Sequence, residues 1–416
     1  MEGGARPEPR FAGLKTALRA FRYRNYRLYF GGQGVSLTGS WMQQMAMGWL
    51  VFRLTGSSFY LGVVAFFAQV PVIFMSPLAG VLADRWDRMR IMLVAQVLAM
   101  VQAFVLALLM FSKAIAPWQL LPLAFFLGMA NALDAPARHS MIVQVVEKKE
   151  DLGNAIALNS AMFNGARLIG PPLAGILIGL AGEGVCFLIN GFSYLAVIFA
   201  LLAMRFAPRE RRRRGAGFWP ELREGFAYTF STRPIRLIIA HIAWISLVGV
   251  SYVTLMPVFV RRGLDGGPHS MGFLLGAAGC GALLGALTLA SRRRGHGLEA
   301  IMAGGALLFG VVLVGLAMAR TFWLAMPLMF LGGLGMMVQM ASANTYIQQR
   351  VSDDKRARVM SIYTMAFMGA TPIGSFLLGT LASVVGVRLA IALGGALSLA
   401  GTLVFARRFL SLSGSE

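Results

Sequence analysis

Long apolar runs that contain no charged side chain constrain this chain more than any other feature. Eleven such runs, with histidine counted as neutral, are at least 18 residues long: 28–52, 54–83, 91–112, 114–133, 184–204, 237–260, 266–291, 300–319, 321–349, 359–387 and 389–406. A twelfth segment, 152–182, has similar length and is interrupted once, by Arg167. A helix of about 20 apolar residues crosses the hydrocarbon core of a bilayer. The sequence therefore predicts an all-α integral membrane protein with twelve transmembrane helices.

The basic residues gather on one side of these predicted spans. Of the 38 Lys and Arg, 31 lie in the segments 1–27, 84–90, 138–152, 205–236, 292–299, 350–358 and 407–416. Short basic loops are retained in the cytoplasm, so we predict a multi-pass protein of the bacterial inner membrane with both termini cytoplasmic. The net charge of +21 then records orientation and possible contact with membrane lipid, and nucleic acid is not an expected partner.

The spacing of glycines indicates an internal repeat. An offset of 204 residues superimposes three pairs of glycines: Gly165 and Gly369, Gly170 and Gly374, and Gly175 and Gly379. We therefore expect two pseudo-symmetric six-helix bundles.

The expected units are a cytoplasmic N-terminal segment (1–26), an N-terminal bundle (27–205), a cytoplasmic basic linker (206–233), a C-terminal bundle (234–408) and a cytoplasmic tail (409–416). Parallel repeats around a mid-membrane site are typical of secondary transporters.

The loop after the second predicted span carries a recognisable motif. Its sequence, GVLADRWDRMR from Gly80, resembles the signature loop of the major facilitator superfamily. The resemblance implies the major facilitator fold, with Gly80, Asp84, Arg85 and Arg88 stabilising the closed cytoplasmic side. The alternative is a helix cap among cytoplasmic arginines. Asp87 replaces the usual glycine of the family pattern.

The fifth predicted span in chain order, 152–182, contains the sequence GARLIGPPLAG. Its Gly165, Gly170, Pro171 and Gly175 resemble the glycine-proline motif of proton-coupled exporters in the superfamily. Small residues permit close helix packing, and proline removes a backbone hydrogen bond. The alternative is a general small-residue interface. Ala124 stands where drug–proton antiporters of the family carry an arginine, so the resemblance does not supply their proton relay.

Three further segments resemble a narrower branch of the superfamily, which contains the enterobactin exporter and macrolide-efflux proteins. They are 24–29, 131–138 and 151–159, with the sequences RNYRLY, NALDAPAR and DLGNAIALN. This branch implies export of siderophore-like compounds or drugs.

Two ionisable residues lie at membrane depth, where such groups are costly and usually functional. Arg167 and Asp134 are therefore candidate substrate or coupling residues. The alternatives are a structural ion pair between them, or a pair of Asp134 with Arg138 four residues later. Further candidates are polar side chains within spans, each of which can instead bond a neighbouring helix: Asn164, Gln44, Gln69, His241, Tyr252 and Gln339.

These features favour a transporter over an enzyme. The chain has no phosphate-binding Gly-Lys-Ser/Thr loop and no recognisable metal or nucleophile motif around its four histidines, so we expect no cofactor and no metal. The leading hypothesis is a monomeric exporter of small amphipathic molecules, drugs or siderophore-like compounds, driven by proton antiport with alternating access. The alternatives are a lysophospholipid or small-solute importer, and a non-transporting membrane receptor on the same fold.

Overall fold

The computed structural model describes residues 18–85, 87–205, 218–291 and 297–413, and these residues are helical almost throughout. The first half of the chain forms η1 (Arg19–Arg22), α2 (Arg24–Thr55), α3 (Ser58–Arg85), α4 (Arg88–Phe111), α5 (Pro117–Val145), α6 (Lys149–Ala181) and α7 (Glu183–Ala203). The second half forms α8 (Phe218–Ser231), α9 (Arg233–Val248), η2 (Val250–Leu255), α10 (Met256–Val258), η3 (Phe259–Gly263), α11 (Pro268–Ala290), α12 (Leu298–Met318), α13 (Phe322–Arg350), α14 (Asp353–Val385) and α15 (Val387–Ser413).

Within these described residues, eleven helical segments are long and apolar enough to cross a membrane. The segment α9 to η3 counts as one of them, as Arg233–Gly263. The first predicted span, 28–52, lies in α2 and is not among the eleven. Helix α2 has 32 residues, but its amides Gln33, Gln43 and Gln44 lower its mean hydropathy. Hydropathy alone therefore finds eleven of the twelve predicted spans.

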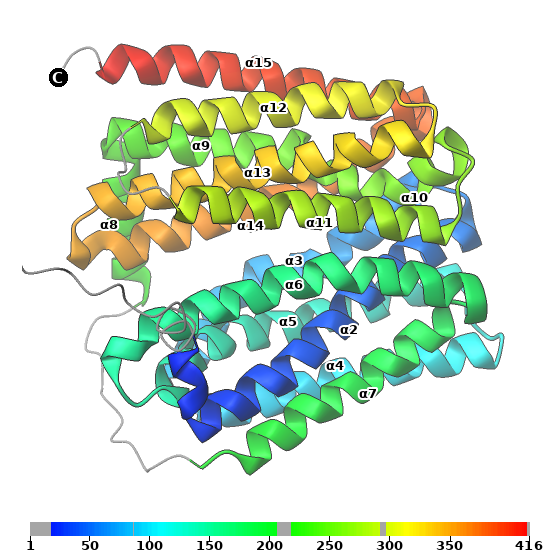
Figure 1. The fold of residues 1–416 in the computed structure, drawn as a ribbon, viewed down its shortest axis with the longest axis horizontal. Coiled ribbons are helices and arrows are strands. Elements are labelled where there is room, and N and C mark those ends of the chain that lie inside the picture. The colour runs from blue at the N-terminus through cyan, green and yellow to red at the C-terminus, as the bar shows by residue number, and fades with distance from the viewer. Residues whose placement is uncertain (1–17, 86, 206–217, 292–296, 414–416) are drawn as a thin grey trace, which may run out of the picture.

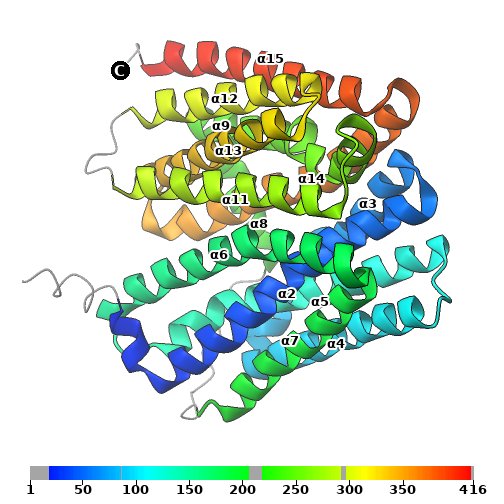
Figure 2. The same ribbon diagram turned by 45° about the vertical axis from the view of Figure 1, so that its right-hand side comes forward.

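The helices form two groups that lie on opposite sides of the molecule. Helices α2 to α7, the first group, pack with one another, and α9 to α15, the second group, lie beside them (Figures 1 and 2). Two long helix pairs form the main contacts between the groups, because α6 packs along α11 and α3 packs along α14; η2 and α10 also contact α3 and α2. Any space enclosed between the groups is therefore bordered by helices from both halves of the chain.

The connections at the two ends of these helices differ in length and charge. What we call the short-turn end contains the connections 56–57, 112–116, 182, 264–267, 319–321 and 386. We call the opposite end the basic end, because the seven segments that hold 31 of the 38 Lys and Arg belong to it in the sequence. Gly182 and Gly386 end α6 and α14 with φ of 81° and 85°, in a region that is essentially restricted to glycine. They are also 204 residues apart, so the turns follow the internal repeat.

The seventh predicted span is not a uniform helix. The charge-free run 237–260 predicts one continuous helix, but the α-helical geometry of α9 ends at Val248 and the chain continues as 3₁₀, α and π turns. The Ser251 hydroxyl donates toward the carbonyl oxygens of Ser246 at 3.0 Å and Thr371 at 3.1 Å. Pro257 in α10 lacks a backbone N–H. Both residues favour a change of helix type, which frequently marks a hinge or functional segment.

At the basic end, η1 and the first residues of α2 are fixed to the start of α6. The Tyr23 hydroxyl donates to Asp151 Oδ2 at 2.7 Å, and Arg22 forms an ion pair with the same carboxylate. The Ala20 amide donates to Asn154 Oδ1 at 3.0 Å. The Tyr26 hydroxyl donates to the backbone oxygen of α6 at Ala155, at 3.1 Å. Two segments that carried the branch resemblance, 24–29 and 151–159, therefore lie against each other.

Candidate transport cavity

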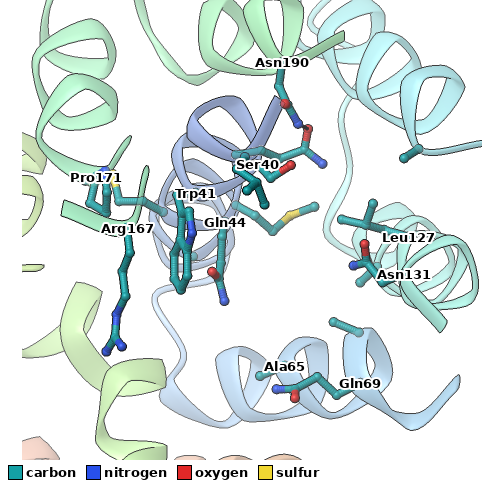
Figure 3. Close-up of a pocket in the computed structure, with 18 of the residues that line it drawn as sticks. Ser40, Trp41, Gln44, Ala65, Gln69, Leu127, Asn131, Arg167, Pro171 and Asn190 are labelled. Atoms are coloured by element: carbon teal, nitrogen blue, oxygen red, sulfur yellow. Dashed lines mark hydrogen bonds between the residues drawn. The ribbon is translucent and has the colours of Figure 1, made fainter. Parts of the chain in front are cut away.

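A cavity of about 480 Å³ lies between the two groups of helices. Its walls come from α2 to α7 in the first group and from η2, α10 and α11 in the second. Figure 3 shows the open region bordered by side chains of α2, α3, α5 and α6. The volume is within the range of about 300–1,000 Å³ that is usual for pockets holding small molecules.

Three charged residues line this cavity among the residues that the structure describes: Asp134, Arg138 and Arg167. Asp134 accepts a hydrogen bond from Gln96 Nε2 at 2.8 Å on one oxygen and lies 3.3 Å from Arg138 Nε on the other. Asp134 is therefore paired within α5 and not with Arg167. This is the pair that the four-residue spacing of Asp134 and Arg138 suggested.

Arg167 has different surroundings, far from both helix ends. It lies about 27 Å along α6 from Lys149 and about 21 Å from Ala181 at 1.5 Å per residue. Its guanidinium carbon is 5.7 Å from the centre of the Trp41 ring, within the range of a cation–π contact. The Trp41 ring packs edge-on against Phe163, with ring centres 5.7 Å apart. No ion pair joins Arg167 to another described residue.

Three amide side chains border the open region from separate helices. Gln44 on α2, Gln69 on α3 and Asn131 on α5 point toward it (Figure 3). Among the described residues, these amides form no hydrogen bond with one another or with a neighbouring helix. Their donors and acceptors are therefore available to a bound molecule.

A second set of amides, which the sequence analysis did not single out, connects helices within the first group. Asn190 Nδ2 donates to Gln43 Oε1 at 2.8 Å, and Gln43 Nε2 donates to Gln102 Oε1 at 2.8 Å. Gln102 in turn donates to the Leu123 carbonyl oxygen at 3.3 Å. Buried amides that bond in a chain rigidify a core. These hydrogen-bonded amides explain why the polar helix α2 is accommodated among apolar helices.

The remaining polar candidates differ in their access to the cavity. Tyr252, in η2, lines the cavity. Asn164 is buried and donates to the Ser160 carbonyl oxygen of its own helix at 2.9 Å. His241 Nε2 lies 3.2 Å from the Thr402 hydroxyl, and its ring stacks on Phe405. Gln339 is buried in α13. The last three are not among the cavity-lining residues.

The glycine-proline motif presents two tightly packed faces of α6. A Cβ added at Gly170 would lie 2.6 Å from Trp41 Cβ on α2, in the first group. A Cβ added at Gly175 would lie 2.7 Å from the Pro268 carbonyl oxygen on α11, in the second group. At Gly165 an added Cβ meets nothing within 4 Å. Pro171 lines the cavity between the two glycine faces.

The repeat-related glycines of α14 reproduce this arrangement. Gly369, like Gly165, has open space around an added Cβ, whereas Gly374 packs against Leu247 in α9. A Cβ added at Gly379 would lie 2.7 Å from the Ser58 carbonyl oxygen and 2.9 Å from Gly62 Cα, both on α3 of the first group. The contact of α6 with α11 at Gly175 and the contact of α14 with α3 at Gly379 therefore share one pattern, and we call them the glycine joints.

One polar contact reinforces these joints at the short-turn end. Arg262 Nη2 donates to the Gly56 carbonyl oxygen at 2.8 Å, and its guanidinium carbon is 5.5 Å from the centre of the Phe52 ring. Arg262 lies in η3, at the end of the irregular seventh segment, and Gly56 ends α2. The short-turn end is thus closed by contacts between the first helix of each group.

The signature loop is described only in part. Helix α3 ends at Arg85, and the side chains of Asp84 and Arg85 and the surroundings of Gly80 lie outside what the structure describes. Arg88 begins α4, where the Asp87 side chain accepts a hydrogen bond from the Met89 amide at 2.9 Å. Asp87, which replaces the family's glycine, therefore caps α4.

Comparison with known proteins gives relatives along nearly the whole chain. The staphyloferrin A transporter of Staphylococcus aureus is 24% identical over 380 residues, covering 91% of this chain and 95% of the relative. Macrolide efflux protein A of Streptococcus pyogenes is 22% identical over 381 residues, covering 88% of this chain and 92% of the relative. A solved structure of a variant of the nucleoside transporter NupG shares the fold with a TM-score of 0.73 at 15% identity, covering 93% of this chain and 99% of that one.

The fold neighbours and relatives are membrane transporters and not enzymes. The family model described as transmembrane secretion effector, one of the major facilitator families, matches residues 15–415. The chain therefore belongs to the transmembrane secretion effector family of major facilitator transporters.

Proposed function

We propose that this chain is a secondary active exporter of small amphipathic molecules in the bacterial inner membrane, with both termini in the cytoplasm. The observation that carries the proposal is the cavity between two groups of helices, closed at the short-turn end by contacts that follow the internal repeat. A site between two repeats that rock against each other is the basis of alternating access. The positive-inside rule favours a cytoplasmic position for the basic end, which supports an inward-facing state for this arrangement.

Helix α2 supplies the twelfth span in this proposal. It is long enough to cross a bilayer and packs against α6 and α7. Its amides bond other helices or face the cavity instead of contacting lipid, which is how polar groups are tolerated at membrane depth.

The relatives support export as the direction of transport. The family description names secretion, and one relative is named for macrolide efflux. The glycine-proline motif forms a tight joint between the groups, as expected for a helix that rocks as part of a rigid unit. Uptake of a small solute remains the competing outcome.

Asp134 is the proposed proton-coupling residue. It is the single carboxylate among the described residues that line the cavity, and it is held by Arg138 and Gln96. Protonation of Asp134 would remove the charge that holds Arg138, so proton binding and cavity electrostatics are linked.

The test is transport in proteoliposomes with an imposed pH gradient and pyranine trapped inside. Radiolabelled erythromycin and dansyl-glycine serve as probes of different charge. We expect at least one probe to move against its gradient while protons move in the opposite direction. Accumulation that ignores the pH gradient would contradict antiport, and movement with protons in the same direction would favour uptake. Protein-free liposomes give the background.

A further inference from the structure

We infer that the cavity selects amphipathic molecules that carry an organic anion, such as a carboxylate, and that Arg167 binds this anion. The inference rests on the proposed transport function and names the substrate class that the cavity fits. It follows from the charge balance of the lining, from the way the guanidinium is held and from the arrangement of the other walls.

The charges of the cavity do not cancel. Asp134 and Arg138 form an ion pair, so together they contribute little net charge to the cavity. Arg167 has no such partner among the described residues, and the cavity therefore carries an excess of one positive charge. A cation at membrane depth is costly without a counter-charge. An anionic ligand supplies that counter-charge, whereas a cationic ligand is repelled.

The guanidinium of Arg167 is prepared for such a ligand. The guanidinium carbon lies 5.7 Å from the centre of the Trp41 ring, and Trp41 is fixed by the edge-on contact with Phe163 and by the close approach of Gly170. The planar guanidinium can then present its N–H edge to two oxygens of a carboxylate. Figure 3 shows this side chain extended alongside Trp41, and Arg167 is one of the residues that line the cavity.

The other walls fit the rest of an amphipathic molecule. Gln44, Gln69 and Asn131 offer unengaged amide groups on the side away from α6 (Figure 3). Apolar side chains of α2 and α11, including Met47 and Leu275, line the same cavity. Flexible methionines suit ligands of varied shape. The site thus combines one fixed anion-binding group with adaptable surroundings.

The test compares two probes that differ only in charge. Dansyl-glycine carries a carboxylate, and dansyl-glycinamide has a neutral amide in its place. Binding to the full chain in phosphatidylcholine nanodiscs is followed by dansyl emission excited through tryptophan. We expect the carboxylate to bind about tenfold more tightly, which corresponds to about 1.4 kcal/mol. Equal affinities for the wild-type protein overturn the inference without the use of any variant.

Variants assign the preference to Arg167. Arg167→Gln should abolish the difference between the probes, and Arg167→Lys should retain part of it. Arg320→Gln removes the same charge from an exposed turn and should keep the full difference. If Arg167 only packs against Trp41, Arg167→Gln will weaken both probes equally, and that result contradicts the inference. Size-exclusion profiles confirm that each variant is folded.

The source of the anion and the transport function are tested separately. Loss of dansyl-glycine binding when phosphatidylglycerol is added would assign the site to a lipid headgroup and overturn the proposed substrate class. Charge-selective binding without flux in proteoliposomes would leave this inference intact and contradict the proposed exporter. Flux with no preference for the carboxylate would support the proposed exporter and contradict this inference.

Discussion

Asp134 and Arg167 both line the cavity but have different partners, and we propose different roles for them. Asp134 is held by Arg138 and Gln96 within the first group, whereas Arg167 is held by an aromatic ring. A paired carboxylate can exchange a proton and alter its neighbours, and an arginine keeps its charge at all physiological pH values. We therefore assign the proton to Asp134 and the substrate anion to Arg167.

Asp134→Asn should uncouple transport from the proton gradient. The amide cannot take up a proton and leaves the Arg138 guanidinium without a counter-charge. We expect gradient-driven flux to fall to the liposome background, while exchange of labelled for unlabelled substrate at equal concentrations continues. The measurement is both kinds of flux in the same proteoliposomes. Retention of gradient-driven flux would remove Asp134 from the coupling mechanism.

Arg167→Ala should abolish transport while the protein stays folded. The residue forms no ion pair with a described residue, so its removal leaves no buried carboxylate unpaired. We expect flux at background and an elution profile like that of the wild type in detergent. Transport at wild-type rate would show that Arg167 has no part in the substrate pathway, and aggregation would indicate a structural role.

At the scale of the elements, α6 combines an anchor to the first group, a candidate binding residue and a contact with the second group. Its start is tied through Asp151 to Arg22 and Tyr23, just before α2, its middle carries Arg167, and its last turns pack against α11 at Gly175. Helix α14 repeats the joint at Gly379 against α3. Because α6 is anchored in the first group and packs against the second at Gly175, we expect movement between the groups to change the packing at this contact.

The tie at the start of α6 should contribute measurably to stability. Asp151 is buried and accepts from the Tyr23 hydroxyl at 2.7 Å, so Tyr23→Phe removes a hydrogen bond to a charged group. Such bonds contribute about 1.5–3 kcal/mol. We expect a lower midpoint of thermal unfolding for Tyr23→Phe. Tyr29→Phe is the matched control with little effect, because its hydroxyl lies 3.5 Å from Asn159 Oδ1.

A larger side chain at Gly175 should separate the two groups at the short-turn end. In Gly175→Val, the added carbons meet backbone atoms of α11, which cannot move aside as a flexible side chain does. Spin labels at Lys113→Cys and Arg320→Cys, in a background without native cysteines, report the separation of the groups. We expect a longer distance for Gly175→Val. Gly165→Val places the same side chain in open space and should leave the distance unchanged.

At the scale of the whole molecule, the sequence predicts membrane spans and symmetry better than the orientation of side chains. Charge-free runs and the glycine offset depend on local composition, so they locate the helices and the repeat. The side that a mid-span residue faces depends on tertiary packing. Asn164 lies three residues before Arg167 but bonds its own helix. Trp41, which holds Arg167, looks like any other apolar residue in the sequence.

The break in the seventh segment shows the same limit at larger scale. An apolar run with no charge predicts a continuous helix, and Pro257 alone does not specify the 3₁₀ and π turns that the structure contains. Those turns depend on contacts with distant residues, as when the Ser251 hydroxyl donates to the Thr371 carbonyl oxygen. They bring Tyr252 to the cavity and Arg262 to the end of α2.

The contact between Arg262 and Gly56 should bias the molecule toward the state closed at the short-turn end. Arg262→Ala removes one hydrogen bond between the groups, which contributes about 1 kcal/mol. This corresponds to roughly a fivefold shift in the equilibrium between the closed and open states.

Hydrogen–deuterium exchange of the backbone around Gly56 measures that shift. We expect faster exchange in Arg262→Ala, because the turn after α2 is released each time the end opens. Arg261→Ala removes the same charge from the adjacent exposed residue and should exchange like the wild type. Equal exchange in both variants would show that the glycine joints close this end without Arg262, and the closed state would then depend on helix packing alone.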